Sequence, residues 1–175
     1  MKGGVRMMSS SLQRPKLAIP KTTGEKIADI IGYGAYIGAL VFLLYHWQRL
    51  PDEVPAHYNA VGEVDRWGSK MELFILPVVG FFLALFMQMV ERFPETHNYP
   101  ARLNEQNAHA FYTLSRKLTN QLKNSSLVIF SLLTIQTVLI AQEKLDSLSS
   151  LFLPFFMVVV CAPIVICLVK QRRIQ

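Results

Sequence analysis

The sequence predicts an all-α integral membrane protein with four transmembrane helices, and its composition and the spacing of its charges carry this prediction. Hydrophobic residues make up 51% of the 175 residues and charged residues only 17%, whereas a soluble domain carries about 25% charge. Four runs of 18 or 19 residues contain no charge: 30–47, 73–90, 125–142 and 151–169. Each run is close to the roughly 20 apolar residues that cross about 30 Å of hydrocarbon. None has the polar stripe of a helix at the surface of a soluble protein.

The expected elements follow from these runs. We predict a membrane domain over residues 23–170, with helices at about 27–48, 70–91, 125–142 and 150–169. An outer loop at 49–69 and a cytoplasmic loop at 92–124 join the first three helices. Residues 1–22 are expected to form a flexible, basic cytoplasmic segment, and residues 171–175 a cytoplasmic tail.

The basic residues predict which side of the membrane each loop faces. Of the 18 Lys and Arg residues, 14 fall before the first helix, in the loop 92–124 or from the end of the last helix onward, and four fall in the other two loops. Because cytoplasmic loops carry the excess of Lys and Arg, we expect a multi-pass protein with both termini in the cytoplasm. Topology explains the net charge of +6, so we expect no nucleic-acid partner.

The first helix contains small residues at helical spacing. Gly34 and Gly38 form a small-xxx-small pair, and such pairs let helix backbones approach closely in lipid. The pair predicts either a homo-oligomer interface or close packing against another helix of the same bundle.

The loop 92–124 has a helical pattern of its own. Apolar residues recur from Leu103 to Leu122, and Arg116 and Lys123 occupy other positions. The pattern predicts a cytoplasmic amphipathic helix. This helix either lies on the leaflet, where anionic lipid attracts its basic residues, or continues directly into the third membrane helix.

The outer loop is expected to form a short extracytoplasmic hairpin. Pro51 and Pro55 disfavour helix, and Gly62 lies in a turn-like segment where it is able to adopt positive φ. We expect the hairpin to pack on the ends of the helices through Val54, Tyr58, Val61, Val64 and Trp67.

This loop also carries a recognisable pattern, Leu-Pro-x-x-Val-Pro-x-His-Tyr-Asn-x-x-Gly-x-x-Asp-x-Trp-Gly-Ser-Lys, from Leu50 to Lys70. It closely resembles the signature of a bacterial membrane domain of unknown function, found at the N-terminus of Sdp-type toxin-immunity proteins. The resemblance continues at Asn98-Tyr-Pro and at Glu105-x-Asn, and covers roughly residues 27–140. It implies a polytopic protein of a bacterial cytoplasmic membrane, which in some relatives provides immunity to a secreted peptide toxin and signals its presence.

Polar and aromatic side chains of the outer loop are the candidates for binding a partner or ligand. They are His57, Tyr58, Asn59, Asp65, Trp67 and Lys70. His57, Asn59 and Asp65 could instead satisfy backbone groups of the loop. They also offer metal-ligand atoms, but their spacing matches no closed zinc motif. We predict no metal, no cofactor and no catalytic residue.

These observations favour a non-enzymatic sensor or immunity-type protein that recognises a secreted peptide or another membrane protein through the outer loop. Catalytic signatures such as Gly-x-Ser-x-Gly and His-Glu-x-x-His are absent from the sequence. One alternative is a small transporter or accessory subunit, which would need polar residues such as Thr134 and Gln136 to converge inside the bundle. Another is a membrane enzyme that uses His57 and Asp65.

Overall fold

The computed structural model describes residues 14–175, so most of the segment expected to be flexible, residues 1–13, lies outside the described part. The described chain has four helices long and apolar enough to cross a membrane, as the sequence predicts. They are α1 (Thr23–His46), α2 (Ile75–Arg92), α3 (Ala108–Ala141) and α4 (Phe152–Arg172). Short 3-10 helices follow α1 at Trp47–Arg49 and precede α2 at Lys70–Phe74. A third lies at Pro94–Thr96.

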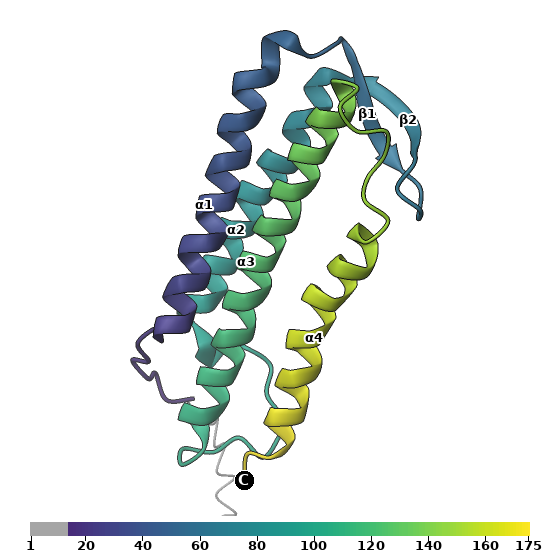
Figure 1. Ribbon diagram of the computed structural model, residues 1–175. Coiled ribbons are helices and arrows are strands. Elements are labelled where there is room, and N and C mark those ends of the chain that lie inside the picture. The colour runs from purple at the N-terminus through teal and green to yellow at the C-terminus, as the bar shows by residue number, and fades with distance from the viewer. Residues whose placement is uncertain (1–13) are drawn as a thin grey trace, which may run out of the picture.

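The four helices run side by side and define two ends of the bundle (Figure 1). The α1–α2 and α3–α4 connections lie at one end, which we call the hairpin end. The α2–α3 connection and the C-terminus lie at the other, which we call the terminal end. This arrangement brings together the loops that the basic-residue pattern assigns to a common side.

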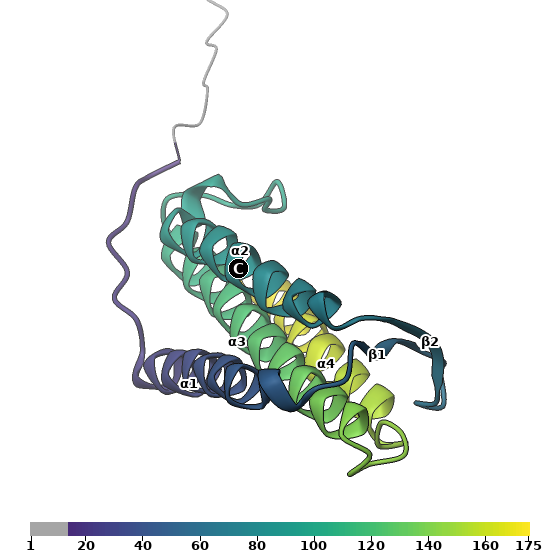
Figure 2. The ribbon, with the colours of Figure 1, turned by 90° about the horizontal axis from the view of Figure 1, so that it is seen from above.

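α3 is the centre of the bundle. α1, α2 and α4 each pack against it, and a view from the hairpin end shows α3 between α1 and α2 (Figure 2). Half of the apolar stretch of α3 is buried inside the protein, against 6% of that of α4. α4 therefore meets the rest of the chain along one side only.

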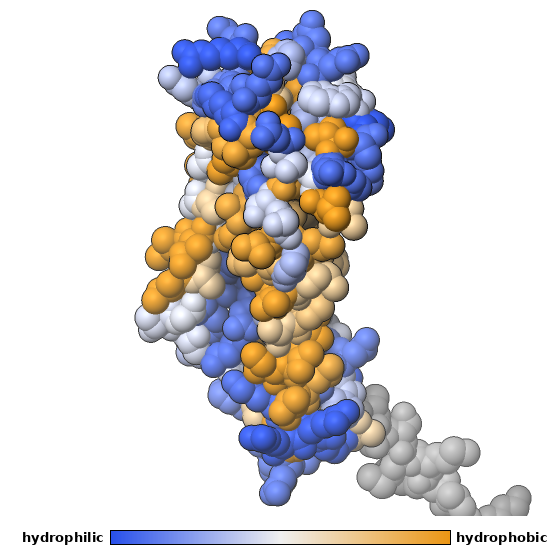
Figure 3. Space-filling view, turned by 45° about the vertical axis from the view of Figure 1, so that its right-hand side comes forward, coloured by the Kyte–Doolittle hydropathy of each residue, from blue (hydrophilic) through white to orange (hydrophobic). Residues whose placement is uncertain are grey.

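The sides of the bundle are apolar and its ends are polar (Figure 3). Large apolar side chains stand exposed on α1, α2 and α4, among them Ile30, Val41, Phe82, Phe86, Val158 and Val165. Soluble monomers rarely expose contiguous apolar surface on this scale. The distribution suits a bundle whose sides face hydrocarbon.

The sequence placed the start of the third membrane helix at 125, whereas α3 runs unbroken from Ala108 to Ala141. The continuous alternative is therefore the one the structure has. No Pro or Gly interrupts the segment, so its backbone hydrogen bonds continue without a break. A helix lying on the leaflet would also have needed Arg116 and Lys123 on its outside, but their exposed fractions are 4% and 0%.

These two bases belong to a buried charge cluster at the terminal end. Lys123 lies between Asp29 of α1 and Glu91 of α2, with N–O distances of 2.9 Å to both. Arg116 donates to both carboxylate oxygens of Glu25, each at 2.9 Å. Because buried charges are tolerated when they are paired, the cluster ties α1 and α2 to the central helix.

Residues 14–22, part of the segment expected to be flexible, contact this cluster through Lys21 and their backbone. Lys21 Nζ lies 2.7 Å from carboxylate oxygens of both Asp29 and Glu91. Burial disfavours its charge, but the hydrogen bonds to the two acids outweigh this and raise the pKa of Lys21. Arg116 donates to two backbone carbonyls of the segment. The segment therefore supplies partners to buried charges.

Gly32 makes the close approach between α1 and α3, rather than Gly34 or Gly38. A Cβ at Gly32 would lie 2.9 Å from the Cβ of Asn124, whereas one at Gly34 or Gly38 would meet no atom within 4 Å. Close packing within the bundle is thus not the role of the Gly34–Gly38 pair in the described chain. A homo-oligomer through these two residues stays a prediction.

The loop between α1 and α2 forms a two-stranded antiparallel sheet, β1 (Glu53–Tyr58) and β2 (Val64–Ser69). β1 packs against α3. The fully buried Val54 joins an apolar cluster at the hairpin end with Leu43, Leu73 and Val138. A two-stranded sheet is marginal alone, so this packing holds it in place.

The turn of the hairpin is fixed by Gly62 and by the α3–α4 loop. Gly62 has φ +91°, and its carbonyl accepts a hydrogen bond of 2.9 Å from the Leu148 amide. Two of the expected apolar contacts are wrong, because Val61 is 63% exposed and Trp67 is 53% exposed. The turn meets the bundle through the Gly62 backbone at this point, which leaves most of the neighbouring Val61 side chain exposed.

Candidate functional site

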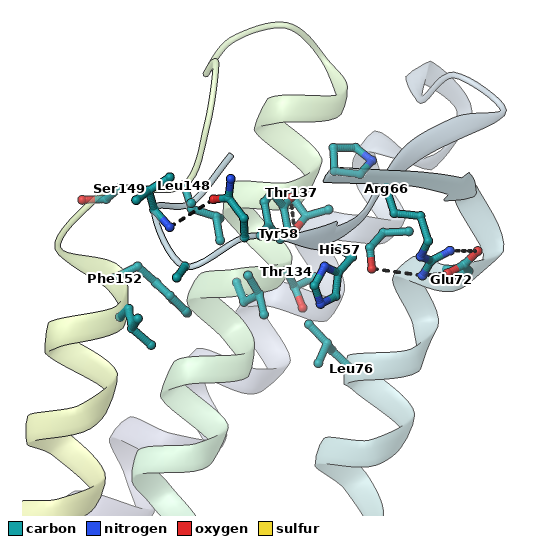
Figure 4. A pocket seen from close by; sticks show the side chains of 18 of the residues that line it. His57, Tyr58, Arg66, Glu72, Leu76, Thr134, Thr137, Leu148, Ser149 and Phe152 are labelled. Atoms are coloured by element: carbon teal, nitrogen blue, oxygen red, sulfur yellow. Dashed lines mark hydrogen bonds and ion pairs between the residues drawn. The ribbon is translucent and has the colours of Figure 1, made fainter. Parts of the chain in front are cut away.

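A cavity of about 560 Å³ lies beneath the hairpin, between α2, α3 and α4. Figure 4 shows its wall helices with β1 above them. Apolar side chains line the part that faces the membrane core, including Leu76 of α2, Leu133 of α3 and Phe152 of α4. Small-molecule sites typically measure about 300–1,000 Å³, so the cavity has the size of a binding site.

Tyr58 connects the hairpin to the wall of the cavity. Its hydroxyl donates to Thr137 Oγ1 of α3 at 2.9 Å. Burial raises the pKa of the Tyr58 phenol, so the group stays protonated and acts as the donor. The register of the sheet is irregular on both sides of His57. Such bulges redirect side chains, and both His57 and Tyr58 line the cavity.

An ion pair lies at the edge of the cavity nearest α2. Arg66 of β2 donates to the two carboxylate oxygens of Glu72 at 2.8 and 3.3 Å, and to the Ala56 carbonyl at 3.2 Å. The hydrogen bond that Arg66 donates to the Glu72 carboxylate raises the pKa of Arg66. The two charges therefore compensate each other where they line the cavity.

His57 and Asp65 form a second polar pair, with 2.6 Å between His57 Nδ1 and Asp65 Oδ1. The carboxylate accepts from Nδ1–H, which leaves Nε2 available. Within residues 14–175, Nε2 has no hydrogen-bond partner. The two side chains are 65% and 43% exposed, so the pair lies at the rim of the cavity rather than deep inside it. Figure 4 shows the imidazole beside Thr134.

Asn59 has a structural role in the turn. Its Oδ1 accepts from the amides of Val61 and Glu63, both at 3.0 Å, and its Nδ2 donates to the Glu63 carboxylate at 2.9 Å. These contacts engage both polar atoms of the side chain. Asn59 therefore hydrogen-bonds backbone groups of its own loop, which is the alternative that the sequence offered to partner binding.

Trp67 and Lys70 lie outside the cavity. Trp67 is half-exposed on β2. Lys70 lies 3.2 Å from an oxygen of Asp52 and 5.5 Å from the centre of the Trp47 ring. The six candidates predicted from the sequence therefore fall into three groups. Residues 57–59 line the cavity, Asp65 contacts His57, and Trp67 and Lys70 lie outside the cavity.

Sequence reasoning missed several residues that shape the site. Thr137 and Leu148 come from α3 and the loop after it, and Tyr58 and Thr137 are 79 positions apart. No local sequence pattern predicts a contact between residues so far apart in the chain. The Arg66–Glu72 pair carried a weak signal, since opposite charges lie six residues apart, Arg66 on β2 and Glu72 within the short 3-10 helix Lys70–Phe74.

The polar residues expected for a transport path are used locally. The Thr134 hydroxyl donates to the Phe130 carbonyl of its own helix at 2.8 Å, and Gln136 Oε1 accepts from the Ser149 amide at 3.2 Å. Across residues 14–175, no group of three or more His, Cys, Asp or Glu side chains is placed to hold a metal ion.

Part of the chain is similar to other proteins of unknown function. Residues 35–81 match a domain of unknown function, DUF1648. A curated relative from Archaeoglobus fulgidus, described as an uncharacterized protein, is 40% identical over 74 residues. This match covers 36% of the chain and 40% of the relative. No solved structure matches the chain.

The match to the domain of unknown function begins in α1, includes the whole hairpin and ends in α2. The whole hairpin therefore lies within the matched segment. The archaeal source of the relative gives no support for assigning the chain to a bacterium. Neither comparison mentions toxin immunity.

Proposed function

We propose that this chain is a non-enzymatic membrane protein of sensor or immunity type, which recognises a secreted peptide or another membrane protein through the hairpin Glu53–Ser69. In this proposal the hairpin lies outside a bacterial cytoplasmic membrane and both termini lie in the cytoplasm. One observation carries it: the hairpin is anchored to the bundle, yet His57, Asp65 and Trp67 remain 65%, 43% and 53% exposed.

Anchoring and exposure fall on different residues of the hairpin. Val54 is fully buried and Tyr58 is bonded to α3, so the backbone is held in place before any partner arrives. A preorganised surface loses little conformational entropy on binding. Tryptophan is one of the residues that contribute most of the binding energy in many protein interfaces, and Trp67 is exposed on this preorganised hairpin.

The His57–Asp65 pair also favours a second candidate, a membrane enzyme in which His57 Nε2 accepts a proton. A carboxylate that holds Nδ1 orients an imidazole for general-base chemistry. Ser69, which could act as a nucleophile, instead accepts a 3.3 Å hydrogen bond from the Met71 amide as a helix cap. The binding role therefore has more structural support than catalysis.

The test compares variants in a strain that lacks the chromosomal gene. Cells carrying the wild-type chain should survive conditioned medium that contains the secreted peptides of their siblings, and cells carrying Asp65→Ala or Trp67→Ala should not. Membrane abundance and thermal midpoint of both variants should stay near wild type, because neither side chain anchors the hairpin.

Asn59→Ala is the matched control, since Asn59 belongs to the same hairpin but holds its turn. It should lower the thermal midpoint and the abundance together. Equal survival with and without the wild-type chain would refute the immunity role. A loss of abundance in Asp65→Ala and Trp67→Ala that parallels the loss of survival would mean that these residues only support the fold.

A further inference from the structure

We propose that the cavity between α2, α3 and α4 binds a single-chain amphiphile with an uncharged, hydrogen-bonding head group, which enters sideways from the bilayer. This site shares His57 with the exposed hairpin face of the proposed function, but its lining includes neither Asp65 nor Trp67. Either proposal can fail while the other stands.

The size of the cavity selects a chain rather than a helix. A helix with its side chains is about 10–12 Å wide. A space of about 560 Å³ would hold only about 5–7 Å of such a helix, roughly one turn. A single flexible hydrocarbon chain fits this space without requiring the bundle to open.

The walls leave a lateral entrance. α2 and α4 each pack on α3 but have little contact with one another, and both line the cavity. Ile75 at the start of α2 and Leu153 at the start of α4 line it while being 54% and 45% exposed. These two side chains stand at the hairpin ends of segments apolar enough to span a membrane, so in this proposal the mouth opens at the outer edge of the hydrocarbon.

Most polar groups of the lining come from the hairpin and the α3–α4 loop, and most of its helix residues are apolar. His57, Tyr58 and Ser149 belong to the first group, and Leu76, Leu133 and Phe152 to the second; Leu76 lies lower on the helix wall than His57 (Figure 4). His57 Nε2, which has no partner within the described residues, is available for a hydrogen bond. This gradient matches a molecule with its head at the hairpin end and its chain along the bundle.

The charges of the lining indicate an uncharged head. Arg66 and Glu72 are its only Arg, Lys, Asp or Glu residues in the described chain, and they are paired with each other at 2.8 Å. A charged head would find no uncompensated partner, and burying an unpaired charge is costly. Hydroxyl or amide groups need only hydrogen bonds, which the hairpin side supplies.

The experiment uses the full chain in nanodiscs of two-chain phospholipid, labelled with a monoacylglycerol that carries a diazirine in its chain. Labelling should saturate, map to the peptides around Leu76, Leu133 and Phe152, and be displaced by monooleoylglycerol at concentrations at least tenfold below those needed for oleyl phosphate. Leu76→Trp fills the cavity and should reduce saturable labelling at least fivefold.

Leu85→Trp is the matched control, because Leu85 lies on the same helix, is 50% exposed and does not line the cavity. Its labelling should equal that of the wild type. Ser150→Trp adds bulk from an exposed loop position of the lining and should reproduce the Leu76→Trp loss even if Leu76→Trp folds poorly. Labelling that does not saturate, or that is equal in Ser150→Trp and Leu85→Trp, would overturn the site. Equal displacement by oleyl phosphate would overturn the uncharged head.

Discussion

Gly62 determines the shape of the turn between the two strands. Its φ of +91° lies in a region that strains residues with a Cβ, and a Cβ there would lie 2.7 Å from the Leu148 carbonyl oxygen. Gly62→Val should lower the free energy of unfolding by about 1–3 kcal/mol. The measurement is the thermal midpoint of the purified protein in detergent.

Gly24→Val provides the control for this prediction, because Gly24 is exposed and a Cβ there meets no atom within 4 Å. Its midpoint should stay close to that of the wild type. Equal midpoints for the two variants would show that Gly62 does not constrain the turn.

For single residues, the sequence predicts conformation correctly where the conformation depends on neighbours in the chain. Gly62 and Asn59 stand in a turn-like segment, and their backbone requirements can be anticipated from their neighbours. The exposure of Val61 could not be anticipated from the sequence, because it depends on how the turn meets Leu148 in the α3–α4 loop. That contact joins segments 86 residues apart, and no pattern in either segment encodes it.

The central element is α3, which combines a membrane span with a polar half that is buried. Its length follows from an unbroken helical sequence, so the continuous helix was within reach of the sequence. The burial of Arg116 and Lys123 could not be predicted from the sequence. Basic residues on an amphipathic helix normally face solvent or lipid heads, and here acids from α1 and α2 reverse that expectation.

This element yields a stability prediction at Lys123, which is fully buried between Asp29 and Glu91. Lys123→Met leaves both carboxylates without that partner. Removing one member of a buried ion pair costs about 3–5 kcal/mol, so the variant should lose that much stability or fail to accumulate in the membrane.

Lys117→Met is the comparison for this change, because Lys117 lies on the same helix, is only partly buried and forms no salt bridge within residues 14–175. Its effect should stay within about 0.5 kcal/mol. If Lys123→Met and Lys117→Met unfold alike, the charge cluster does not hold the terminal end together.

The whole molecule has two polar ends with different structures. The terminal end is closed by paired charges and by residues 14–22, whereas the hairpin end combines a cavity with exposed side chains. The number of membrane helices could be predicted from the four charge-free runs. Charged side chains are costly in hydrocarbon, so membrane spans are recognisable by the absence of charge. The cavity could not be predicted from the sequence. It arises from how far apart α2, α3 and α4 lie, and no sequence pattern in these helices indicates that distance.

Recognition of a secreted peptide requires the hairpin to face the outside of the cell. Single-cysteine variants in a chain with Cys161 and Cys167 replaced by Ala test this most directly, because Glu63 of the turn and Glu105 of the α2–α3 loop are both exposed. In intact cells, an impermeant maleimide should label Glu63→Cys, while Glu105→Cys should react only after the membrane is opened. Labelling of Glu105→Cys in intact cells, with Glu63→Cys protected, would place the hairpin in the cytoplasm and contradict the proposed function.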